Sequence, residues 1–176
     1  MSRIGKKSIK IPSTVILEFS NNNLKIKGEY GKIEKQFLNY IHFIKKENEL
    51  IINCIDNTKE AKSYYGLSRA LIQNMIIGVN QLFKKILIIE GVGYKFQLDP
   101  NFLILNIGYT HPVKIKLIPN INLKLENPTK LIIEGINKEY VGLFAAKVRD
   151  MKLPEPYKGK GILYEGEIIR RKTGKK

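Results

Sequence analysis

The residues near the C-terminus carry the clearest chemistry in the chain. The segment PEPYKGKG, at residues 154–161, places two prolines ahead of two glycines, and each glycine follows a lysine. Neither Gly159 nor Gly161 has a Cβ atom, so their backbone amides can approach phosphate oxygens. The neighbouring side chains of Lys158 and Lys160 supply positive charge. The pattern therefore predicts contact with the phosphate backbone of RNA.

A basic run, RRKTGKK at residues 170–176, follows this segment. Such a run is usually a solvated tail, but here a Pro-Gly-Lys segment precedes it, which favours contact with RNA. Tyr157 can stack on a base or ribose, or it can pack on the preceding helix.

The sequence offers few other residues that could act in catalysis or bind a metal. Cys54 is the single cysteine, and with only His42 and His111 beside it the sequence has no zinc-ligand spacing. Cys54 lies in an apolar stretch and is expected to be a small buried side chain. The GVG at residues 91–93 lacks the third glycine of a dinucleotide loop, because position 96 is Phe, and it predicts a turn. We therefore predict no enzyme, no metal and no cofactor.

Charge and hydropathy narrow the class of partner. The 176 residues include 31 Lys plus Arg against 16 Asp plus Glu, a net charge of +15, and 43% are hydrophobic. A folded chain this basic is expected to bind a polyanion, either a nucleic acid or an anionic membrane surface. No apolar run reaches the roughly 18 residues of a membrane span, and neither expected helix has a wholly basic polar face. A membrane role is therefore the least expected one.

The helices and strands that position these residues are expected in the same order, strands followed by one helix, in each half of the chain. In the first half, Leu24 and Ile26 alternate with lysines as in a strand, residues 49–55 are apolar enough for a buried strand, and residues 61–82 have helical periodicity after a cap at Asn57 or Thr58. In the second half, residues 102–109, 112–117 and 130–135 are strand-like, and a helix follows Asn137. Pro154 and Pro156 end the helical stretch.

The two halves also match in letters, since GLSRALIQNM at Gly66 and GLFAAKVRDM at Gly142 share four residues at constant spacing. Lys59-Glu60 likewise matches Lys138-Glu139, and Leu24 matches Leu103. We predict an α+β fold of two similar, duplicated domains, each an antiparallel β-sheet packed against one α-helix. Residues 1–82 form the N-terminal domain and residues 83–176 the C-terminal domain, which carries the basic RNA-binding tail.

PEPYKGKGI, followed by YEGE and IIRRKTGKK, resembles the C-terminal motif of the bacterial-type large-subunit ribosomal protein six family. The opening MSRIGKKSIKIP and the central FKKILIIEGVGYKF are also similar to that family, so the resemblance covers the whole chain. It implies two similar α+β domains and a structural, non-enzymatic role on large-subunit rRNA near the stalk base and the elongation-factor site. The implied partners are that rRNA, neighbouring large-subunit proteins and, transiently, elongation factors.

Carried over residue by residue, the family's rRNA contacts correspond to Lys152, Tyr157, Lys158, Gly159, Lys160, Gly161, Arg170, Arg171 and Lys172. The family usually has Arg at the position of Leu163, so this chain departs from the pattern at one expected phosphate contact. The implied location is the cytoplasmic ribosome of a bacterium or, alternatively, a plastid or other organelle ribosome. A free-standing RNA-binding regulator or chaperone with the same fold is the main alternative function.

Overall fold

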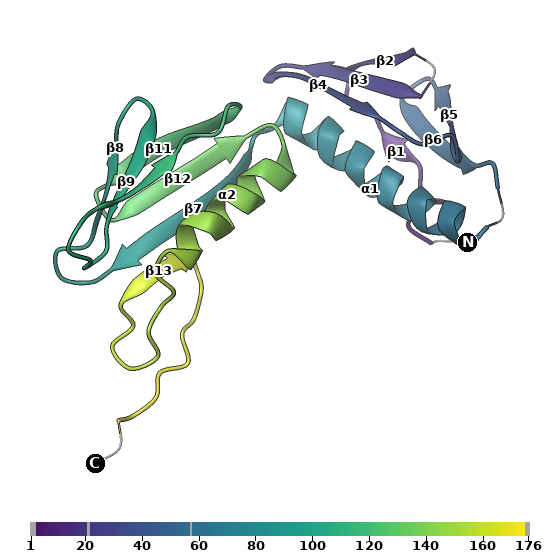
Figure 1. Cartoon of the computed structure of the whole chain (residues 1–176). Helices are drawn as coiled ribbons and strands as arrows, with labels where there is room; N and C mark the ends of the chain where they lie inside the picture. Colours follow the sequence, from purple (N-terminus) through teal and green to yellow (C-terminus); the bar gives the residue numbers. More distant parts are fainter. Residues whose placement is uncertain (1–2, 21, 57, 175–176) are drawn as a thin grey trace. The chain divides into compact units, whose positions relative to one another are not determined.

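The computed structural model describes residues 3–20, 22–56 and 58–174. The chain divides into two compact units, the first ending at Leu82 and the second beginning at Phe83 (Figure 1). Each unit packs antiparallel strands against one helix. The predicted α+β class with a duplicated plan is confirmed.

The first unit holds two three-stranded antiparallel sheets and helix α1. Its elements are β1 (Ile9–Lys10), β2 (Ile16–Ser20), β3 (Asn23–Gly28), β4 (Gly31–Gln36), β5 (Ile41–Lys46), β6 (Glu49–Cys54) and α1 (Lys59–Asn80). The strand orders are β2-β3-β4 and β1-β6-β5, and α1 contacts β3, β4 and β6.

Helix α1 begins where local hydrogen bonding predicts it. The Oγ1 atom of Thr58 accepts from the Ala61 amide at 3.2 Å, which satisfies one of the unpaired donors of the first turn. Asn57, the other expected cap, lies outside the described residues. The buried face of the helix follows the expected three- and four-residue spacing and comprises Ala61, Tyr65, Ser68, Ile72, Met75, Ile76, Gly78 and Val79.

Strand β6 differs from the expectation of a strand buried on both faces. Leu50 and Ile52 are buried, whereas Ile51 is half-buried and Asn53 is exposed. The strand lies between β1 and β5 with only one face toward the core, so its apolar residues are buried on alternate positions. Cys54 consequently is half-buried rather than buried.

The second unit has a four-stranded sheet, a three-stranded sheet and helix α2. Its elements are β7 (Phe83–Glu90), β8 (Lys95–Leu98), β9 (Phe102–Asn106), β10 (Val113–Lys116), β11 (Ile121–Asn127), β12 (Lys130–Gly135), α2 (Lys138–Asp150) and β13 (Gly161–Tyr164). The strand orders are β11-β12-β7-β13 and β10-β9-β8, and α2 lies against β7, β12 and β13. Asn137 caps α2 as expected, because its Oδ1 atom accepts from the Glu139 amide at 2.9 Å.

Residues that correspond between the two halves of the sequence have equivalent positions in the two units. Leu24 in β3 and Leu103 in β9 are both fully buried, and Lys59 and Lys138 are each the first residue of a helix. The GVG segment at residues 91–93 forms the turn between β7 and β8.

Candidate nucleic-acid interface

The PEPYKGKG segment forms a closed loop between α2 and β13. The Glu155 amide donates to the Lys160 carbonyl at 2.9 Å, and the Gly159 amide donates to the Glu155 carbonyl at 3.0 Å. These bonds leave Tyr157, with 55% of its surface exposed, and Lys158 on the outside of the loop. The loop therefore presents an aromatic ring and an ammonium group to solvent.

The two glycines of this loop shape it from within. Both are buried, and their φ angles are +74° at Gly159 and +146° at Gly161. A Cβ atom on Gly161 would lie 2.6 Å from Pro154 Cα, a distance at which the backbone has to shift. Because the Gly159 amide bonds within the loop, its role differs from the expected approach of that amide to phosphate.

The C-terminal basic segment returns to this loop. The Lys172 amide donates to the Pro156 carbonyl at 3.0 Å. A Cβ atom on Gly159 would lie 3.2 Å from the Arg171 Nη2 atom, which places the guanidinium against the loop. The structure thus brings Arg171 and Lys172 to the lysines of PEPYKGKG, and Arg170 is exposed beside them in sequence.

An ion pair holds the segment after β13 against α2. The spacing of its two residues in the sequence does not reveal it. Arg149 of α2 contacts Glu167 through two hydrogen bonds, with Nη2–Oε1 at 2.6 Å and Nε–Oε2 at 3.2 Å. The Arg149 guanidinium also lies 5.5 Å from the centre of the Tyr164 ring. Eighteen residues separate Arg149 from Glu167, so no helical or strand period could have paired them.

Lys152 lies at the start of the loop, and its side chain contacts Tyr109. Its ammonium is 5.0 Å from the centre of the Tyr109 ring, and the Tyr109 hydroxyl donates to the Met151 carbonyl at 3.2 Å. The Lys152 carbonyl accepts from the Ile162 amide at 2.9 Å, which joins the loop's first residues to β13. Tyr109, which sequence reasoning did not include, therefore holds the Lys152 charge in place.

Leu163 stands where the family usually has Arg, and its surroundings in the structure suit an apolar side chain. It lies opposite Ile88 in the β13–β7 pairing and is only 5% exposed. An apolar side chain in this position is part of the sheet packing and does not face a phosphate.

The other residues considered for catalysis or metal binding are the two histidines and the cysteine. His42 and His111 are exposed, and the Cys54 thiol donates to the Asp56 carbonyl at 3.0 Å. Within the described ranges, His, Cys, Asp and Glu side chains form no cluster of three that could hold a metal ion. Neither α1 nor α2 has the length and apolar character needed to cross a bilayer.

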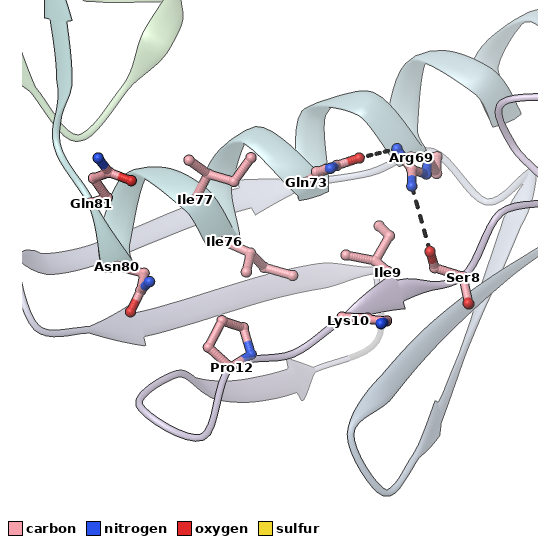
Figure 2. Close-up of a pocket in the computed structure, with 10 residues that line it drawn as sticks. All are labelled: Ser8, Ile9, Lys10, Pro12, Arg69, Gln73, Ile76, Ile77, Asn80 and Gln81. Atoms are coloured by element: carbon pink, nitrogen blue, oxygen red, sulfur yellow. Dashed lines mark hydrogen bonds between the residues drawn. The ribbon is translucent and has the colours of Figure 1, made fainter.

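A pocket of about 420 Å³ in the first unit lies between the β1 segment and α1 (Figure 2). Arg69 reaches from α1 across it, bonds with Gln73 and donates to the carbonyl groups of Lys7 at 3.3 Å and Ser8 at 3.5 Å. The guanidinium is thus occupied in tying the N-terminal segment to the helix, and this accounts for its position.

Both units match one family model, described as ribosomal protein L6, at residues 11–81 and 90–165. The chain belongs to the ribosomal protein L6 family. Its relatives include "Large ribosomal subunit protein uL6" of Moorella thermoacetica, 46% identical over 99% of this chain and 96% of the relative. The protein of the same name from Staphylococcus aureus strain JH9 is 45% identical over 99% of this chain and 98% of the relative. Membership of the L6 family confirms the prediction of a structural, non-enzymatic ribosomal protein.

Proposed function

We propose that this protein is a structural component of the large ribosomal subunit that binds large-subunit rRNA through its second unit. The observation that carries the proposal is the docking of the basic C-terminal segment on the PEPYKGKG loop, fixed by the bond between Lys172 and Pro156. The residues proposed to form the rRNA-binding site are Lys152, Tyr157, Lys158, Gly159, Lys160, Gly161, Arg170, Arg171 and Lys172.

Their roles differ. Lys158, Lys160, Arg171 and Lys172 neutralise phosphates, and binding therefore releases counterions from the RNA. Gly159 and Gly161 hold the loop shape that allows these charges to meet the RNA together. Tyr157, exposed at the tip of the loop, offers a ring on which a base or ribose can stack.

Binding of this kind is a geometric function. A rigid, basic loop that occupies a junction between rRNA helices fixes one arrangement of those helices. The family resemblance supports a position near the stalk base and the elongation-factor site, with neighbouring large-subunit proteins as partners. The bacterial relatives support a cytoplasmic, bacterial-type ribosome as its location.

The test measures binding of the full chain to a transcript of bacterial large-subunit rRNA at several salt concentrations. Replacing both Lys158 and Lys160 with Gln should lower the slope of log affinity against log salt by about two units. The charge-matched control replaces Lys114 and Lys116, which are exposed on β10. Equal slopes for the two double variants would contradict a site at the loop.

A second measurement addresses the assembled particle. A structural component should remain with the large subunit during sedimentation in high salt, whereas a free-standing regulator should wash off. The loop variant should be depleted from the particles relative to the control variant.

A further inference from the structure

A second basic feature lies in the first unit, on the face of the β2-β3-β4 sheet that is turned away from α1. Strand register arranges its side chains in two rows across the three strands. One row consists of Glu18, Lys25 and Glu34, and the other consists of Ile16, Lys27 and Lys32. The opposite face of the same strands carries the buried Leu24 and Ile26 and packs on α1 (Figure 1).

The two rows differ in charge balance. Lys25 lies between two carboxylates, and its Nζ atom is 3.5 Å from Glu34 Oε2. Lys27 and Lys32 instead lie directly opposite each other, and within the described part of the chain neither forms an ion pair with a carboxylate. Like charges at directly opposite strand positions destabilise a sheet. The pair thus carries a repulsion that a bound anion would relieve.

The hairpin that carries this pair is held in place by the helix. The Tyr30 amide, in the turn between β3 and β4, donates to the Val79 carbonyl at 3.1 Å. A Cβ atom on Gly28 would lie 2.6 Å from the same oxygen, so the turn is packed closely against the end of α1. Lys27 and Lys32 each lie one residue from this anchored turn and are presented at a fixed spacing.

We infer that Lys27 and Lys32 together bind a phosphate of the RNA backbone, which gives the first unit a contact of its own. A groove of about 350 Å³ lies on this face and is lined by both rows, by Ile16, Lys27 and Lys32 and also by Glu18, Lys25 and Glu34. Ile16, which lies opposite Lys27, is 57% exposed, so apolar surface for a ribose or base lies beside the two ammonium groups. The inference rests on the proposal that the protein binds rRNA.

Charge arrangement favours a phosphodiester over an acidic protein surface. An acidic protein face would bring further carboxylates against Glu18 and Glu34 in the adjacent row. One phosphate has oxygens enough to accept from both ammonium groups at once and touches only the row that lacks acidic residues.

The first test uses the full chain with Lys27 and Lys32 both replaced by Gln, and the same rRNA transcript. Because one phosphate contact is lost, the salt slope should fall by about one unit and the affinity at low salt about tenfold. The thermal midpoint of the free protein should be unchanged or higher, because the repulsion is gone. The matched control replaces Lys45 and Lys59, two exposed lysines of the same unit, and should keep the wild-type slope.

Running the Lys158/Lys160 variant in the same series separates the two claims. If that variant loses affinity while the Lys27/Lys32 variant binds like the wild type, the hairpin contact is wrong and the proposed function stands. If only the Lys27/Lys32 variant loses affinity, the loop assignment is wrong and the hairpin contact stands.

The second test identifies the partner in assembled particles. A photoreactive p-benzoylphenylalanine replacing Ile16 should cross-link to RNA in large subunits, and the same group at the exposed Leu38 reports the background. A cross-link from position 16 to a protein, or none above that background, would overturn the inference.

Discussion

Arg149 and Glu167 join α2 to the segment that follows β13 through two parallel hydrogen bonds. Their side chains are 25% and 26% exposed, so the pair is substantially shielded from water. Glu167 also accepts from the Tyr164 amide at 3.0 Å. Three hydrogen bonds on one carboxylate set the direction in which the basic segment leaves the sheet.

Replacing Glu167 with Gln should lower the free energy of unfolding by about 1–2 kcal/mol, because charge-assisted hydrogen bonds are lost. The matched control is Glu165→Gln, which affects the Lys130–Glu165 pair, where the Glu165 side chain is 48% exposed. An exposed pair contributes about 0–1 kcal/mol. Urea unfolding of the variants compares the losses, and equal losses would contradict a special role for Glu167.

The stability of the second unit should depend on pH through the same carboxylate. The Arg149 hydrogen bond, and after it the Tyr164 amide, lower the pKa of Glu167 below its ordinary value of 4.5. Because the folded-state pKa is the lower one, ionised Glu167 stabilises the fold above the unfolded-state value, and this contribution is lost as the pH falls through the folded-state pKa. The stability difference between the wild type and Glu167→Gln should therefore shrink in urea titrations as the pH is lowered from 7 to well below 4.5.

Gly161 should be far less replaceable than Gly166. Both have positive φ, at +146° and +81°, but a Cβ atom on Gly166 would meet nothing within 4 Å. Gly166→Ala should therefore cost only backbone strain, about 1 kcal/mol, whereas Gly161→Ala must also displace the Pro154 backbone. Thermal unfolding of the two variants checks this order, and similar midpoints would show that the chain near Pro154 yields easily.

The Cys54 thiol should react more slowly with a labelling reagent in the native protein than in denaturant. It is half-buried and its sulfur donates to the Asp56 carbonyl, so access of the reagent to the thiol is hindered. Cys54→Ala should leave the affinity for the large-subunit rRNA transcript unchanged. A loss of affinity would reveal a functional role for this thiol.

Local signals made much of the fold predictable. The caps Thr58 and Asn137 and the helical spacing that follows them act within a few residues, so both helices begin as predicted. The buried Leu24 and Ile26 of β3 follow the two-residue period of a strand with one wet face. Strand β6 was misjudged because a continuous apolar run does not reveal which of its faces meets the core.

The candidate interface depends more on long-range pairing. Charge and glycine spacing point to residues 154–161, but only the pairing of β13 with β7 decides that Leu163 is buried. The contacts of Lys172 with Pro156 and of Arg149 with Glu167 likewise join residues that no local period relates. The RNA contacts themselves stay predictions.

The unequal lengths of the two helices indicate how the copies of a duplicated unit diverged. Met75 and Met151 occupy matching positions of GLSRALIQNM and GLFAAKVRDM, yet α1 continues to Asn80 while α2 ends at Asp150. In the second unit the backbone after the matched methionine is therefore outside the helix and forms the PEPYKGKG loop. The residues that follow one shared motif thus extend a helix in one unit and, in the other, build the loop that we propose binds RNA.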